Sequence, residues 1–115
     1  MPKEAFTGHA SESGLMIVTR PEIDDALTSP VLVTGIANAF ESTVNIRLKD
    51  GKDKVLKERS TTTNAPDMGK FGDFSLKVDF NPPSTKKGKI EVFEYSARDG
   101  SEVNKVIIPV NFQSD

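Results

Sequence analysis

The clearest pattern in the chain is an alternation of apolar and polar residues with a period of two. It is most regular from residue 74 to residue 80, where Phe, Leu, Val and Phe alternate with Ser, Lys and Asp, and it recurs from residue 44 to residue 49. Such alternation is typical of a β-strand with one buried and one solvated face. With the other short apolar and β-branched runs, the expected strands cover residues 15–19, 31–37, 44–49, 54–57, 74–80, 90–95 and 106–112.

Turn-forming residues separate these runs. Asn81-Pro82-Pro83 ends the most regular strand, and Asp50-Gly51 and Asp99-Gly100 tolerate the positive φ angles of tight hairpins. Pro109 lies inside the last run, and because proline has no N–H to donate to a ladder, it predicts a sheet edge or a bulge. Gly35 lies inside the second run and predicts a bulge or a close approach of neighbouring groups.

Length and strand pattern together predict a single all-β domain. No stretch repeats helical spacing over ten or more residues, and a chain of 115 residues is long enough for one hydrophobic core. About seven short antiparallel strands at this length favour an immunoglobulin-like β-sandwich. Residues 1–14 lack periodicity and are expected to be a flexible tail or linker, with the sandwich domain covering residues 15–115.

The expected strand at 90–95 has apolar residues in both phases. Ile90 and Val92 share one face, whereas Phe93 and Tyr95 share the other. If the aromatic pair points outward, it forms a patch that can stack on a sugar or receive a partner. Aromatic side chains are more commonly part of a core, so both alternatives stay open at this point.

Composition restricts the chemistry that the chain can perform. It contains 15 Lys plus Arg against 17 Asp plus Glu, so no basic excess is available for binding nucleic acid. It has no cysteine, which excludes disulfides and thiolate ligands. The single histidine, His9, falls in the expected tail, and the aspartates lie near predicted turns without the spacing of a calcium loop. We therefore expect no enzyme activity, no cofactor and no bound metal.

Several segments resemble a known family. Residues 29–42 (SPVLVTGIANAFES), followed by 44–47, resemble the opening half of the immunoglobulin-like domain of bacterial spore germination, whose pattern runs from a proline-led strand to a Phe-Glu pair. Residues 71–75, 96–101 and 106–110 are similar to its fifth-strand entry, last hairpin and closing strand. The resemblance implies an extracytoplasmic module of spore-forming or related Gram-positive bacteria, without known catalytic residues.

The expected location thus comes from the resemblance and not from a targeting signal. The first residues lack the apolar stretch of a signal peptide, and no apolar run approaches the ~18 residues needed to span a bilayer.

Two functional hypotheses follow. The first is a binding or scaffolding module of the cell envelope, associated with sporulation or germination, in which Phe40 and Glu41 combine an apolar anchor with a charge for docking to an envelope protein. The plainer alternative makes Phe40 a plug at one end of the sandwich and Glu41 a solvated corner residue. The second hypothesis is a carbohydrate-binding module for cell-wall or cortex glycan, with outward-facing Phe93 and Tyr95 as its aromatic surface.

Overall fold

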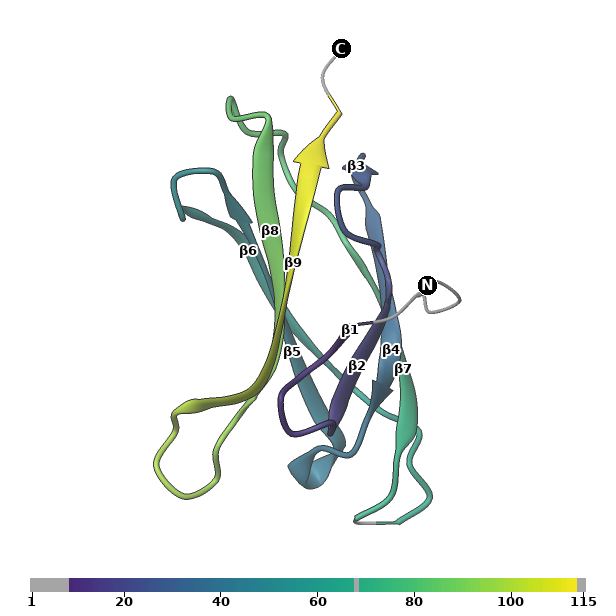
Figure 1. Cartoon of the computed structure of the whole chain (residues 1–115). Coiled ribbons are helices and arrows are strands. Elements are labelled where there is room, and N and C mark those ends of the chain that lie inside the picture. The colour runs from purple at the N-terminus through teal and green to yellow at the C-terminus, as the bar shows by residue number, and fades with distance from the viewer. Residues whose placement is uncertain (1–8, 68, 114–115) are drawn as a thin grey trace.

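The computed structural model of the chain describes residues 9–67 and 69–113. Nine strands in this part of the chain form two sheets that face one another, as Figure 1 shows. In chain order the elements are β1 (His9–Ala10), β2 (Met16–Arg20), β3 (Ala26–Leu27), β4 (Val31–Ala37), the short 3₁₀ turn η1 (Phe40–Ser42), β5 (Thr43–Asp50), β6 (Val55–Thr62), β7 (Gly72–Val78), β8 (Lys87–Tyr95) and β9 (Glu102–Phe112).

The two sheets have different sizes. The four-stranded sheet has the order β1-β2-β4-β7, and the five-stranded sheet has the order β3-β9-β8-β5-β6. Neighbouring strands are antiparallel except for β3 and β9, which run in the same direction. The all-β, immunoglobulin-like sandwich expected from the sequence is confirmed. Each expected strand is present, and the two-residue strands β1 and β3 are additional.

β1 lies within the segment that the sequence led us to assign to a tail. His9 pairs with Val18 and Ala10 with Ile17, and the following residue, Ser11, is buried. The sheet therefore begins ahead of residue 15, and His9 is a strand residue instead of a linker residue. Residues 1–8 lie outside the described part of the chain.

The core fills the space between the sheets. The alternating residues of β5 and β7 point into it as predicted: Val44, Ile46 and Leu48 are buried, as are Phe74 and Val78, whereas Leu76 is only partly buried. Inward-facing residues of the other strands complete the cluster, namely Met16, Val18, Leu27, Val31, Val33, Ala37, Ile90, Val92, Val106, Ile108, Val110 and Phe112, together with Phe80 after β7.

Gly35 lies at a close approach, as its place in the strand pattern indicates. It pairs with Phe74 of β7, and a Cβ atom at residue 35 would collide with the carbonyl oxygen of Ile17 and lie 2.6 Å from Cζ of the Phe74 ring. The aromatic ring covers the space over the glycine and packs between the sheets. Only a residue without a side chain fits here.

Pro109 lies where β9 has no strand partner on one side. Its carbonyl accepts a hydrogen bond from the Asp24 N–H at 2.8 Å, on the side away from β8. The N–H and C=O of a residue in an antiparallel strand point to the same side, so the missing proline N–H faces this open side and removes no ladder bond to β8. The edge interpretation of Pro109 is confirmed.

Within the described residues, no helix has the length and apolar character needed to cross a membrane.

Candidate functional site

Several connections meet at the lower end of the sandwich in Figure 1, which we call the loop end. The loop end comprises the β1–β2 loop (residues 11–15), η1 between β4 and β5, the β6–β7 loop (residues 63–71) and the β8–β9 hairpin (residues 96–101). Among the described residues of these connections, three large apolar side chains are exposed: Leu15, Phe40 and Phe71. Exposed apolar groups on the loops of a rigid sandwich are candidates for partner contact.

Phe40 and Glu41 occupy a tight turn between the two sheets. Glu41 and Ser42 have φ angles of 54° and 57°, a left-handed conformation that is uncommon for residues other than glycine. The turn leaves Phe40 51% exposed and Glu41 exposed beside it. Phe40 is therefore not a plug of the sandwich, and the plainer interpretation of this residue is wrong.

A buried carboxylate holds this turn in place. Glu94 of β8 is 6% exposed, and its Oε1 accepts a hydrogen bond from the Phe40 N–H at 3.0 Å. Its Oε2 accepts a bond from Nδ2 of Asn104 at 2.6 Å, and Oδ1 of Asn104 accepts one from the Ser13 hydroxyl at 2.6 Å. The hydroxyls of Ser13 and Ser11 lie 3.0 Å apart. One chain of polar contacts thus ties β8, η1, β9 and the β1–β2 loop together.

The β6–β7 loop has separate attachments. Nδ2 of Asn38 donates to the Gly69 carbonyl at 3.0 Å, and the Asn38 N–H donates to the Leu15 carbonyl at 2.9 Å. Oδ1 of Asn64 accepts a bond from the Asp73 N–H at 2.7 Å. The β1–β2 loop, η1 and the β6–β7 loop are therefore each bonded to a neighbouring connection or to a strand, whereas the hydrogen bonds that the β8–β9 hairpin makes among the described residues lie within the hairpin itself.

Phe93 and Tyr95 lie on the outer face of the five-stranded sheet, since Ile90 and Val92 fill the core face of β8. The register of β8 and β9 shifts here, and both Asn104 and Lys105 lie opposite Phe93. Phe93 nevertheless has 0% exposure. Of the two alternatives, the one in which Phe93 and Tyr95 point away from the core is the correct one. Phe93 is nevertheless not part of the accessible surface.

Cationic and aromatic side chains cover Phe93. The Arg47 guanidinium lies 4.5 Å from the ring centroid and Lys105 Nζ lies 5.4 Å from it. The Tyr95 ring meets the Phe93 ring edge-on at 5.1 Å, and Tyr95 itself is 43% exposed. Cations over an aromatic face are attracted by the ring quadrupole, so these side chains stabilise the fold as well as shield the Phe93 ring from solvent.

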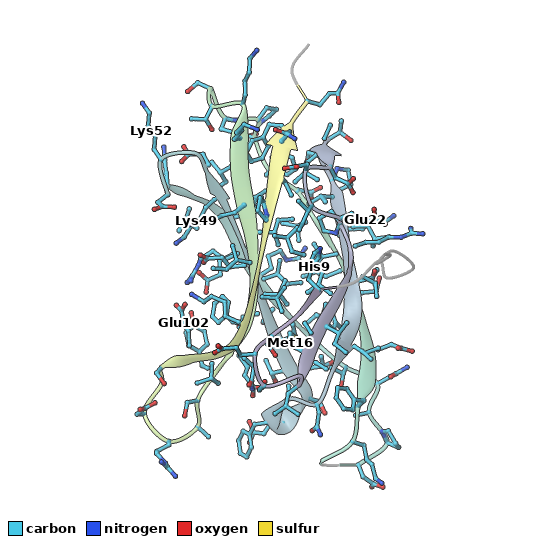
Figure 2. The ribbon with its side chains drawn as sticks, in the orientation of Figure 1. His9, Met16, Glu22, Lys49, Lys52 and Glu102 are labelled. Carbon is cyan, nitrogen blue, oxygen red and sulfur yellow. The ribbon has the colours of Figure 1, made fainter. Side chains whose placement is uncertain are left out.

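Arg47 is the centre of an ion network on this outer face. It contacts Glu91 at 2.7 Å and makes a two-pronged contact with Glu102 at 2.9 and 2.7 Å. Figure 2 shows Glu102 and Lys49, which pairs with Glu91, on the side of the five-stranded sheet that faces away from Met16. The carboxylates of this outer face are thus paired with its cations.

The network shifts the ionisation of its members. Hydrogen bonds to Glu102 and Glu91 raise the pKa of Arg47, and hydrogen bonds from Arg47 and Lys105 lower the pKa of Glu102 to about 2. Burial alone would raise the pKa of Glu91, but the nearby cations, Arg47 first, outweigh it and lower that pKa. The Tyr95 hydroxyl donates to Glu58 at 2.9 Å, which raises the pKa of Tyr95.

A comparison with protein families identifies the domain. The family described as the immunoglobulin-like domain of bacterial spore germination matches residues 16–101, from β2 to the end of the β8–β9 hairpin. The chain belongs to this family. The match confirms the resemblance noted in the sequence and associates the domain with spore germination. No curated protein and no solved structure matches the chain.

Membership of the spore-germination family indicates the setting in general terms. The family points loosely to an extracytoplasmic or spore-associated location, and immunoglobulin-like domains of this kind are generally non-catalytic. Within residues 9–67 and 69–113 there is no group of three or more His, Asp or Glu side chains arranged to hold a metal ion.

Glu94 is the functional candidate that sequence reasoning missed in this member of the spore-germination family. Its signal was present: Glu94 follows Ile90 and Val92 in the phase of β8 that faces the core, and a carboxylate in that phase must find buried partners. The partners themselves, Phe40 and Asn104, come from other strands and connections. Only the fold brings them together.

Proposed function

We propose that this domain is a non-catalytic docking module of the bacterial cell envelope, associated with sporulation or spore germination, and that it binds an envelope protein through its loop end. One observation supports the proposal above the others: Phe40 is 51% exposed while its main-chain N–H is held by the buried Glu94. An exposed aromatic side chain on a held main chain loses little backbone entropy on binding, and aromatic residues of this kind dominate the energy of protein interfaces.

Glu41 gives the proposed interface its selectivity. It lies beside Phe40 on the same turn and is exposed. A carboxylate at the rim of an apolar contact disfavours partners that place an acidic or apolar group opposite it. Phe40 would therefore contribute affinity, and Glu41 would contribute discrimination between partners.

A second candidate function is recognition of cell-wall or cortex glycan on the outer face of the five-stranded sheet. Tyr95 favours it, because its ring is accessible and is surrounded by charged groups that can bond to sugar hydroxyls. Phe93 cannot contribute a second stacking surface, since Arg47 and Lys105 cover its ring. The glycan function would thus depend on one aromatic side chain.

Retention experiments with three variants test both functions. Immobilised wild-type domain, Phe40→Ala, Glu41→Lys and Tyr95→Ala are each exposed to an envelope extract of a spore-forming bacterium, and separately sedimented with purified sacculi. We expect Phe40→Ala to weaken retention of the partner roughly tenfold or more, because it removes the central apolar contact, and Glu41→Lys to reduce it as well. Tyr95→Ala is the matched aromatic control and should retain the partner like wild type.

Circular dichroism and thermal melting establish that each variant is folded. The docking function is contradicted if folded Phe40→Ala and Glu41→Lys retain the same proteins as the wild type to the same extent. If Tyr95→Ala instead abolishes sedimentation with sacculi, the glycan function replaces it.

A further inference from the structure

A surface pocket of about 500 Å³ lies between η1 and the β8–β9 hairpin at the loop end. Its wall includes Phe40 from η1, Glu94 from β8, Val103 from β9, and Arg98 and Asp99 from the hairpin. The proposed docking residue, Phe40, and the residue whose carboxylate holds its main chain, Glu94, therefore border the same space. The other ionisable residues of the wall, Arg98 and Asp99, are exposed.

Glu94 has no cationic partner in the described part of the chain. Its two hydrogen-bond donors, the Phe40 N–H and the Asn104 side-chain amide, are neutral groups. Among residues 9–67 and 69–113, no basic side-chain nitrogen lies within 4.0 Å of its carboxylate oxygens. A buried carboxylate is costly unless a cation pairs with it, and an ionised carboxylate accepts about four hydrogen bonds.

Glu91 provides an internal comparison on the same strand. It is 3% exposed, as deeply buried as Glu94, and it contacts both Arg47 at 2.7 Å and Lys49 at 3.4 Å. The outer face of β8 thus supplies cations for its buried carboxylate, whereas the inner face at the loop end supplies none. Two buried carboxylates of the same strand thus differ: Glu91 is paired with cations, and Glu94, at the pocket, has none beside it among the described residues.

We infer that the pocket receives the ammonium group of a lysine side chain from the partner protein. This inference rests on the proposed docking function and specifies the chemistry of the site. Each carboxylate oxygen of Glu94 already accepts one hydrogen bond, which leaves one lone pair on each oxygen. A compact ammonium needs only one of these lone pairs, whereas a guanidinium fork needs both of them in one plane with its own two N–H groups.

The wall of the pocket also suits the rest of a lysine side chain. Phe40 and Val103 give apolar contact for the four-carbon stem, and the exposed face of the Phe40 ring attracts a cation. Asp99 adds a second negative charge to the wall, and Arg98 is its one cation among the described residues. Arg98 competes with the incoming ammonium group, and it forms no ion pair with Glu94.

An NMR titration of the ¹⁵N-labelled domain tests the inference. The probe is Nα-acetyl-lysine methylamide, and the control ligand is the same molecule with its ε-amine acetylated and therefore neutral. We expect saturable shift changes at the Phe40 amide and the Asn104 side-chain amide, which both donate to Glu94, and binding of the neutral ligand weaker by roughly tenfold or more. Equal binding of the two ligands, or shift changes centred on the outer face near Tyr95, would overturn the inference without the use of any variant.

Variants locate the charge that is responsible. Glu94→Gln keeps the shape and an acceptor for the Phe40 N–H, and it should weaken binding of the lysine probe roughly tenfold. Glu91→Gln is the matched control, a buried carboxylate outside the pocket, and it should bind the probe like wild type. Arg98→Gln should bind more tightly than the wild type, since the competing cation is gone. Unchanged binding by Glu94→Gln would overturn the inference.

The two proposals fail in different ways. If the lysine probe does not bind but Phe40→Ala still abolishes partner retention, the assignment of the pocket is wrong and the docking function stands. If retention is indifferent to both Phe40 and Glu41, the docking function is wrong whatever the probe does.

Discussion

Gly35 and Phe74 form a cross-strand pair in which the Phe74 ring fills the space over both residues. The Phe74 ring extends over Gly35, and the carbonyl of Ile17 on β2 closes the same space from the other side. Aromatic residues opposite glycine protect the backbone of a strand and fill the gap that the missing side chain leaves. The pair therefore leaves no room for a side chain at residue 35.

We expect Gly35→Ala to destabilise the domain by about 1–3 kcal/mol, because the added Cβ forces the Phe74 ring and the β2 backbone to move. Urea unfolding measures the change in the free energy of unfolding. Ser75→Ala, an exposed substitution beside Phe74, should stay within about 0.5 kcal/mol of wild type. A Gly35→Ala variant as stable as the Ser75→Ala variant would show that the space at residue 35 is not restricted.

β8 is buried on both faces at its centre, which makes it the element that joins the core to the outer ion network. Ile90 and Val92 face the core, whereas Glu91 and Phe93 lie under the side chains of β5 and β9. Arg47 contributes both the charge that pairs with Glu91 and the cover of the Phe93 ring. The network therefore acts as a second, smaller packing layer outside the sheet.

Arg47→Met should destabilise the domain most near neutral pH and progressively less in acid. The pKa of Glu102 is about 2 in the folded protein, below its ordinary value of 4.5. The unfolded chain therefore binds more protons between these values, and the stability that Arg47 confers is full above about pH 5 and is lost as the pH falls toward 2. Methionine still covers Phe93, so the variant is expected to fold.

Urea unfolding of wild type and Arg47→Met between about pH 6 and pH 2 measures this difference. Lys52→Met, in the exposed hairpin between β5 and β6, removes a charge outside the network and should show a difference from wild type that hardly changes with pH. A difference for Arg47→Met that is constant over the range would contradict the role of the carboxylates.

The strands differ in how well the sequence predicts them. β5 and β7 each have one buried, apolar face and one polar face, so the alternation of apolar and polar residues identifies both the strand and its buried side. β8 lacks this alternation because long side chains from β5 and β9 cover Phe93 on the outer face. β3 has two residues and is defined by its pairing with β9, so a pattern within its own sequence cannot reveal it.

At the scale of the whole molecule, the sandwich has an open edge at β6. The centre of this strand carries Lys57, Glu58 and Arg59, and Arg59 also donates to the Lys77 carbonyl of β7 at 3.1 Å. Two copies of β6 paired antiparallel about Glu58 or about Arg59 would place like charges opposite each other. Charged residues on an edge strand oppose such pairing between molecules.

We expect replacement of Lys57, Glu58 and Arg59 together by Thr to promote association through β6, because it removes the repulsion and raises β propensity. Sedimentation equilibrium should show an average mass that rises with concentration more steeply than for wild type. The matched control replaces Lys52, Asp53 and Lys54 by Thr, which makes the same change of charge in a turn. If both triple variants behave alike, the charges of the edge are not what opposes association.

The loop end illustrates what sequence reasoning could and could not reach at this scale. Phe40 and Glu41 were identifiable as an apolar and charged pair at a link between strands, but their exposure depends on the left-handed turn at residues 41 and 42. The pocket beside them combines η1 with a hairpin more than fifty residues later in the chain. Its existence depends on the strand order of the sandwich and on no local pattern.

The parallel pairing of β3 with β9 has a mechanical consequence. Main-chain bonds from Asp24 to Pro109, from Asn111 to Asp25 and from Gln113 to Leu27 are arranged side by side along this seam. Because the two strands run in the same direction, tension between the N-terminal side of β3 and the C-terminal end of β9 would load these bonds together in shear instead of opening them one after another. We therefore expect this seam to resist a pull along its length better than an antiparallel hairpin that is opened from one end.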